Sequence, residues 1–280
     1  MPNKSDAPQM SLHFFRGRDE RTEMNRNIVT YPWSLTQPFH LEGGPFGMAT
    51  VIPQSSSGGL YRGDVQRQCI SVDTGAAVHL TSQGATLAHA VRGGKCSQSK
   101  WDLTVADMAW LEVLNDPLVL GSDANVQQFW SIEVGPNGTC LLIDSWTWLN
   151  QDDKPLFNNF NSEIVVQRSK GNILALERAV VNRKDVERLQ DVFASNIRGF
   201  VNGLLFCPEI DLSFTAHLEN NLNKINDCWI GVSTLPSEVG ILVRATCGSA
   251  GVIADVSETI WNVFRRWRLG SDPEARRRGL

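Results

Sequence analysis

The sequence predicts a mainly β fold: a β-helix or solenoid-like stack of strands, followed by flanking α/β elements at the C-terminal end. Two observations support this fold class. Between residues 38 and 181, apolar residues alternate with polar or small ones, which is the period of a half-buried strand. Beyond residue 181, helical spacings appear among the strands. We therefore expect a single domain over 28–270, β-rich over 38–181 and mixed over 182–270.

A loose repeat organises the strand-rich part. Most of its four units read as an apolar strand, a tight turn and a second apolar strand, although the second unit lacks a clear turn residue. The anchoring valines recur about every thirty residues, at Val72, Val105, Val134 and Val166. Such a period predicts stacked units that cover one another's apolar faces, as in a β-solenoid. A two-sheet sandwich of regular hairpins stays open as the alternative.

The C-terminal third combines both periods. Strands are expected over 203–207, 227–232 and 239–245, and helices over 185–197, 211–222 and 252–267. The first helix would begin at Asp185, an acidic residue suited to a helix N-terminus. The last helix places Val256, Ile260 and Phe264 on one apolar stripe.

The two ends of the chain are polar. Residues 1–27 are mixed in charge and lack the apolar core of a signal peptide, so we expect a flexible N-terminus and a cytoplasmic protein. Residues 271–280 form a basic, arginine-rich tail. Such a tail is expected to be solvated, with docking to an acidic partner as the alternative.

Composition excludes several classes of function. The net charge is −4, and the basic tail leaves an acidic body, which argues against nucleic-acid binding. No apolar run is long enough for a membrane-spanning helix. The six cysteines include no Cys-x-x-Cys pair, so free thiols are expected rather than a zinc knuckle.

Several motifs occur in a fixed order from Pro38 to Trp267. The segment 58–64 contains Gly58-Gly59-Leu60 and Gly63-Asp64, and the segment 80–86 reads Leu-Thr-Ser-Gln-Gly-Ala-Thr. Further matches are Pro38-Phe39, Glu177-Arg178, Gly203-Leu204-Leu205, Gly231-x-Ser233-x-Leu235 and Val243-Arg244. In order and spacing, these motifs resemble the UreD (UreH) family of urease accessory proteins.

This resemblance implies an elongated β-helical scaffold that is not an enzyme and has no cofactor of its own. Such a scaffold binds apo-urease and UreF, which recruits the GTPase UreG, and nickel passes through internal channels of the complex. A homodimer within the accessory complex stays open. The binding positions implied by the motifs are Gly58, Gly59, Leu60, Gly63, Asp64, Thr81, Gly84, Ala85, Glu177 and Arg178.

The chain departs from the family pattern at three places. Residues 87–90 replace a basic–aromatic run, 111–116 lack the usual tryptophan, and the C-terminal tail differs. Because these segments could face partners, a diverged scaffold for a client other than urease is the alternative function.

Individual residues suggest local roles. The motif glycines Gly58, Gly59 and Gly63 suit a turn with positive φ, and Asp64 suits a turn cap. Imidazole binds nickel well, so His79 and His89 are the weak metal candidates, with His79 expected to point outward. We expect Trp146 and Trp148 in the core, and ion pairs at Glu177, Arg178 and Arg244.

A rival function is that of a β-solenoid enzyme acting on carbohydrates. Such enzymes need carboxylates gathered on one face of successive coils. Asp73, Asp107 and Glu112 do not recur at matching positions of the repeat, so the sequence favours the scaffold.

Overall fold

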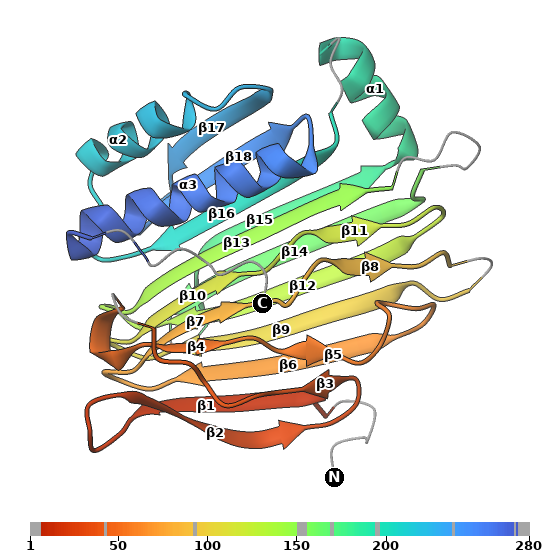
Figure 1. Ribbon diagram of the computed structural model, residues 1–280. Coiled ribbons are helices and arrows are strands. Elements are labelled where there is room, and N and C mark those ends of the chain that lie inside the picture. The colour runs from red at the N-terminus through yellow and green to blue at the C-terminus, as the bar shows by residue number, and fades with distance from the viewer. Residues whose placement is uncertain are drawn as a thin grey trace.

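The structure is a computed structural model that describes residues 7–41, 44–91, 94–149, 156–168, 171–193, 197–236, 239–271 and 273. Two large sheets lie face to face, and helices cover the outer face of one of them at the C-terminal end (Figure 1). The predicted fold class is confirmed: the chain is mostly strand and forms a β-solenoid of about three turns with three C-terminal helices.

The seven-stranded sheet has the order β15-β14-β12-β9-β6-β1-β2. Its strands are β1 (Met10–Arg16), β2 (Thr22–Val29), β6 (Val65–Val72), β9 (Ser97–Val105), β12 (Asn125–Val134), β14 (Asn159–Arg168) and β15 (Asn172–Asn182). From β1 to β14 the neighbours are parallel, whereas β2 and β15 close the two ends as antiparallel strands.

The nine-stranded sheet follows the order β17-β18-β16-β13-β10-β7-β4, and β8 and β11 extend it beside β13. Its strands are β4 (Ala49–Val51), β7 (Ala77–Thr81), β8 (Thr86–Ala88), β10 (Trp110–Leu114), β11 (Leu118–Leu120), β13 (Thr139–Trp148), β16 (Gly199–Phe206), β17 (Cys228–Thr234) and β18 (Ile241–Cys247). A small pair, β3 (Trp33–Ser34) with β5 (Gln54–Ser55), and a 3-10 turn η1 (Pro45–Gly47) complete the N-terminal half.

The repeat in the sequence corresponds to the coils. Each coil passes from a long strand of the first sheet to the second sheet and back, as β6-β7-β8 and β9-β10-β11 do. Val72 lies opposite Val105, which lies opposite Val134. The fourth valine, Val166, lies opposite Ile132, two residues from the expected rung. Parallel pairing between coils excludes the hairpin sandwich, whose ladders would be antiparallel.

The C-terminal helices are α1 (Arg183–Phe193), α2 (Leu212–Leu222) and α3 (Ala250–Leu269). The predictions for α2 and α3 are confirmed, with N-caps Asp211 and Ser249 that accept bonds from Phe214 N and Val252 N. α1 begins two residues earlier than expected. It is described as far as Phe193, and residues 194–196, over which the helix was expected to continue toward 197, lie outside the described chain. α3 packs across β13, β16 and β18.

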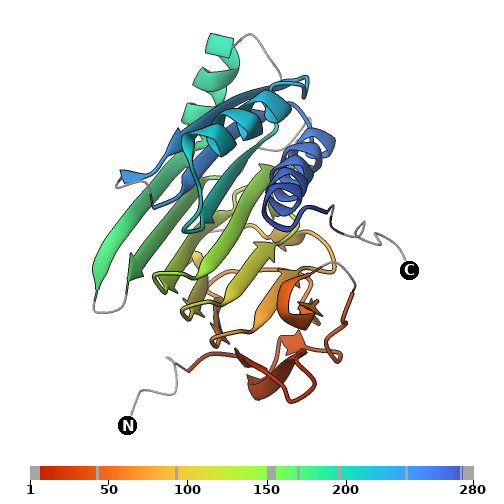
Figure 2. The same ribbon diagram turned by 90° about the vertical axis from the view of Figure 1, so that its left-hand side faces the viewer.

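The expectation of a flexible N-terminus is wrong for the residues described. β1 pairs in parallel with β6 and so adds a strand to the solenoid (Figure 2). Met10, Leu12 and Phe14 are buried because alternate residues of β1 face the core. Residues 1–6, and the basic tail apart from Ser271 and Pro273, lie outside the described chain.

Candidate functional site

Two motif segments that are distant in sequence meet on one side of the solenoid. Leu60 N donates to Leu87 O at 2.8 Å, and His89 N donates to Leu60 O at 2.9 Å. The segment 58–64, called the glycine turn below, is thus joined to β8. Gly59 has φ +136°, and a Cβ there would lie 1.9 Å from Leu87 O. Only glycine fits this position without moving backbone.

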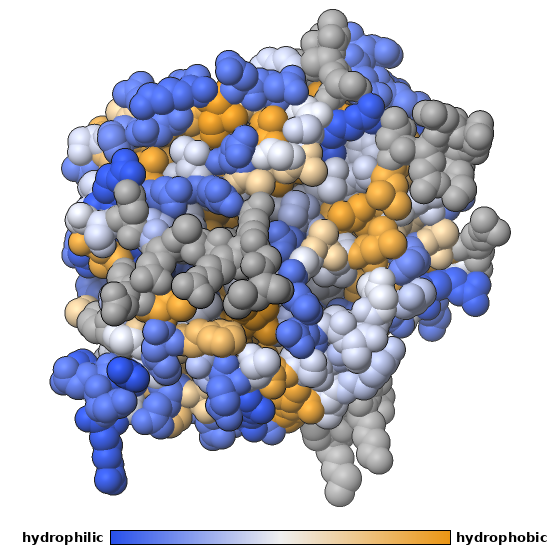
Figure 3. Space-filling model, viewed as in Figure 1, coloured by the Kyte–Doolittle hydropathy of each residue, from blue (hydrophilic) through white to orange (hydrophobic). Residues whose placement is uncertain are grey.

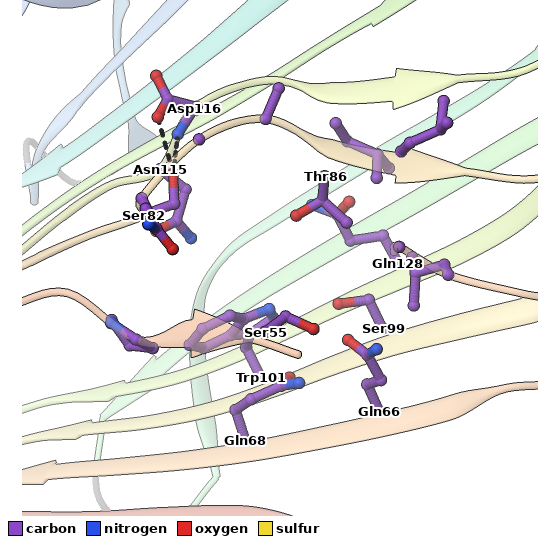
Figure 4. A pocket seen from close by; sticks show the side chains of 18 of the residues that line it. Ser55, Gln66, Gln68, Ser82, Thr86, Ser99, Trp101, Asn115, Asp116 and Gln128 are labelled. Atoms are coloured by element: carbon purple, nitrogen blue, oxygen red, sulfur yellow. Dashed lines mark hydrogen bonds between the residues drawn. The ribbon is translucent and has the colours of Figure 1, made fainter. Parts of the chain in front are cut away.

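Below this turn, a cavity of about 410 Å³ extends between the two sheets (Figure 4). Six of the positions implied by the motifs line it, namely Gly58, Gly59, Leu60, Thr81, Gly84 and Ala85. Gly58, Gly84 and Ala85 are exposed, whereas Gly59, Leu60 and Thr81 are buried. The remaining four positions, Gly63, Asp64, Glu177 and Arg178, lie elsewhere.

A rung of polar side chains crosses the inner face of the seven-stranded sheet. Gln66 lies opposite Ser99, Ser99 opposite Gln128, and Gln128 opposite Ser162. Figure 4 shows Gln66, Ser99 and Gln128 side by side on their strands. Because strand alternation turns these residues toward the other sheet, amides and hydroxyls occupy positions where a solenoid normally buries apolar groups.

Asp144 of β13 faces this rung from the opposite sheet. It accepts hydrogen bonds from Gln128 Nε2 at 2.5 Å and from Ser162 Oγ at 3.4 Å. Burial raises the pKa of Asp144 to about 6, because the desolvation of the carboxylate outweighs the hydrogen bonds that stabilise it. The cavity therefore holds a carboxyl whose pKa lies well above its ordinary value.

The next rung places a buried amide, that of Gln68, beside the cavity. Gln68 lies opposite Trp101, and Trp101 stacks on Trp130 with ring centroids 5.1 Å apart. The side chain of Gln68 is fully buried, and neither of its polar atoms has a hydrogen-bond partner among the residues that the structure describes. Since an unpaired buried amide costs free energy, water or a polar solute is expected beside it.

Two loops close the cavity at its far side. Ser82 Oγ donates to Asp116 Oδ2 at 3.0 Å, and Asp116 N donates to Ser82 Oγ at 2.7 Å (Figure 4). On the glycine turn, Tyr61 stacks on His89 with ring centroids 4.3 Å apart. These contacts hold the turns after β7 and β10, together with the glycine turn, in fixed positions.

Gly63 and Asp64 stabilise the glycine turn. Gly63 has φ +77°, as expected, whereas Gly58 is not in the left-handed region. Tyr61 N donates to Asp64 Oδ2 at 2.9 Å, so the predicted capping role of Asp64 is confirmed.

Glu177 and Arg178 lie on β15 and point to opposite faces of the sheet. Arg178 Nε lies 2.7 Å from Glu163 Oε2, and Glu177 pairs with Arg244 of β18. The expected ion pairs are confirmed, but they lie apart from the cavity.

His79 points to the outer face of β7, as expected, but the expectation that it is a surface histidine is wrong. His79 is 4% exposed, and its Nδ1 lies 2.8 Å from Glu112 Oε2. Alternation assumes a sheet with one solvated face, whereas α3 covers the outer face of β7 here, stacking Trp261 on His79 at 5.0 Å. His89 lies at the glycine turn, with Nε2 3.1 Å from Gly58 O.

The polar cluster around Glu112 could not be recognised from the sequence. The buried carboxylate accepts bonds from Trp110 Nε1, Trp261 Nε1 and Arg265. Although burial opposes its ionisation, the hydrogen bond with His79 and the charge of Arg265 hold the pKa of Glu112 at about 2. The signal would have been Trp261 and Arg265 at i, i+4 in the last helix.

Asp73 and Asp107, the other two carboxylates considered for a carbohydrate enzyme, make local contacts. Asp73 pairs with His13 at 2.7 Å, and Asp107 Oδ1 accepts from Asn137 N at 2.7 Å. Among the residues the structure describes, no group of three His, Cys, Asp or Glu side chains could hold a metal ion. The six cysteines are free, as expected, and Trp146 and Trp148 are buried.

No helix in the described ranges has the length and apolar character needed to cross a membrane. Residues 7–279 match the family model described as UreD urease accessory protein. The chain is 28% identical over 242 residues to "Urease accessory protein UreD 2" of Bradyrhizobium sp. (strain BTAi1), which covers 85% of this chain and 82% of the relative.

Two further relatives are similar over almost their whole length. "Urease accessory protein UreD 1" of Methylorubrum populi is 27% identical over 273 residues, covering 96% of this chain and 91% of the relative. "Urease accessory protein UreD 1" of Pseudomonas syringae pv. syringae is 27% identical over 273 residues, covering 95% and 94%. The chain therefore belongs to the UreD family of urease accessory proteins.

Proposed function

We propose that this protein is a non-catalytic scaffold of urease maturation in the cytoplasm. It binds apo-urease and the UreF–UreG GTPase complex, and it passes nickel toward the urease active site. The observation that carries this proposal is that six motif positions gather around a polar internal cavity.

The chemistry of the cavity suits a cation in transit. Its possible metal-binding groups are amides, hydroxyls and the carboxyls of Asp116 and Asp144, without a thiol or imidazole in the described lining. Oxygen donors of this kind bind divalent nickel more weakly than cysteine or histidine. Weak, replaceable contacts favour movement of the ion and its water over storage.

A partner surface adjoins the cavity. Figure 3 shows an apolar area over β8 and β11, the strands beside the glycine turn. Leu87 of β8 lines the cavity, and Leu149, just after β13, is an exposed apolar residue. A contiguous apolar surface of a soluble domain often marks a protein interface. UreF and apo-urease are the partners that family membership suggests for this surface.

Complementation tests the proposed function. A urease gene cluster that lacks its own UreD gene is expressed with this chain, with a tag on UreF. We expect this chain to co-purify with UreF and to restore urease activity in a nickel-dependent manner. Absence of both the association and the restored activity would contradict the proposal.

A further inference from the structure

The Glu177-Arg178 motif lies on a sheet edge away from the cavity. Within the described part of the chain, β15 pairs with β14 alone and ends the seven-stranded sheet. It is 11 residues long, so its outer edge presents a row of backbone N–H and C=O groups. Such an edge accepts another strand unless charge, proline or a covering element protects it.

The opposite sheet extends one strand further than β15. The ion pair between Glu177 and Arg244 places β18 over β15, and β17 lies beyond β18. On the same face as Arg244, β17 carries Trp229, Gly231 and Ser233, all of them exposed. A Cβ on Gly231 would meet nothing within 4 Å. A strand added to β15 would therefore face β17, and the two sheets would then extend equally far.

The outer face of β15 defines the chemistry of that added strand. Leu176 and Val180 are 48% and 68% exposed, and Arg178 lies between them on the same face. Arg178 pairs with Glu163 of β14, yet its side chain remains 64% exposed. Cross-strand neighbours interact directly, so an acidic residue fits beside Arg178 and apolar residues fit beside Leu176 and Val180.

We propose that the free edge of β15 is a β-augmentation site for an extended segment of a partner protein. In that segment, an acidic residue is flanked at two-residue spacing by apolar residues. The assignment rests on the proposed scaffold function, which requires protein partners, but not on the passage of nickel through the cavity.

The test uses the full chain and two labelled synthetic peptides, Thr-Val-Thr-Glu-Thr-Val-Thr and its matched form with Lys in place of Glu. Fluorescence anisotropy is expected to show binding of the Glu peptide. Arg178→Glu should weaken it about tenfold and strengthen the Lys peptide, because the charge is reversed. Each of the single variants Leu176→Lys and Val180→Lys should abolish binding of the Glu peptide. Lys100→Glu, on the outer face of central strand β9, serves as the control and should change neither affinity.

Two results would overturn the proposal. One is that neither peptide binds, or that both bind equally to the wild-type chain and to Arg178→Glu. The other is that sedimentation shows a dimer of this chain that Leu176→Lys abolishes, which would assign the edge to a second copy. Because the peptide assay needs no urease, its failure beside intact urease activation would refute this inference and leave the proposed function standing.

Discussion

Arg265 of the last helix and Glu112 of a central strand form a fully buried ion pair, with Nε 2.6 Å from Oε1. The two residues belong to α3 and β10, so the pair joins the C-terminal helix to the solenoid. Glu112 also accepts hydrogen bonds from Trp110 and Trp261, which replace the bonds that water would make to the carboxylate. This carboxylate therefore supplies the polar contacts between α3 and β10, beside the apolar stripe of the helix.

Breaking the pair should destabilise the protein strongly. Arg265→Met leaves the Glu112 carboxylate buried with fewer partners, so we expect a loss of about 3–5 kcal/mol in the free energy of unfolding by urea. Arg268→Met, which removes the exposed pair with Glu209, is the control and should cost less than about 1 kcal/mol. Equal effects of the two variants would show that the buried pair has no special role.

The same carboxylate predicts an acid limit to stability. The pKa of Glu112 is about 2 in the folded protein against an ordinary value of 4.5. Its contribution is therefore fully present above about pH 4.5 and lost as the pH falls toward 2. Unfolding curves from pH 6 to pH 3 should show this loss in the wild type and much less of it in Glu112→Gln. A parallel decline in both proteins would contradict the assignment.

Asp144 predicts the opposite pH dependence. Its pKa is about 6 in the folded protein against 3.8, so ionisation of the buried carboxyl costs stability as the pH rises from about 4 through 6. Asp144→Asn removes the charge, and its stability relative to the wild type should improve by up to about 3 kcal/mol between pH 4 and pH 8. Measurement of unfolding free energy at both pH values checks this. A pH-independent difference would show that the carboxyl is not desolvated.

The glycine turn should be intolerant at one position and tolerant at another. Gly59→Ala forces a Cβ against Leu87 O, and we expect a marked fall in the thermal midpoint and loss of the contact between this turn and β8. Gly84→Ala is the matched control, since no atom lies within 4 Å of its Cβ. Similar melting of the two variants would contradict the role given to Gly59.

Features set by local periodicity could be predicted from the sequence. The valine repeat anticipates the stacking of Val72, Val105 and Val134, and the apolar stripe of the last helix anticipates α3. The motif residues also predicted the turn geometry of Gly63 and Asp64. These features depend on neighbours within a strand, a turn or a helix.

Features set by distant contacts could not be predicted. The burial of His79 depends on α3, which lies far along the chain and covers a sheet face that alternation alone treats as solvated. Likewise, β1 appears polar because only Met10, Leu12 and Phe14 among its residues are fully buried, and its pairing partner β6 is remote. The cavity required both sheets, since Asp144 and Gln128 belong to different ones.

The proposed passage of nickel through the cavity is tested by a substitution that fills the cavity. Ser99→Phe fills the cavity from an inward position, whereas Thr104→Phe adds the same ring to an exposed, outward position of the same strand. Urease purified after maturation with each variant is assayed for bound nickel. We predict that Ser99→Phe lowers the nickel content at least about tenfold while the chain still co-purifies with UreF, and that Thr104→Phe leaves it unchanged. Full nickel loading with a folded Ser99→Phe chain would contradict the account.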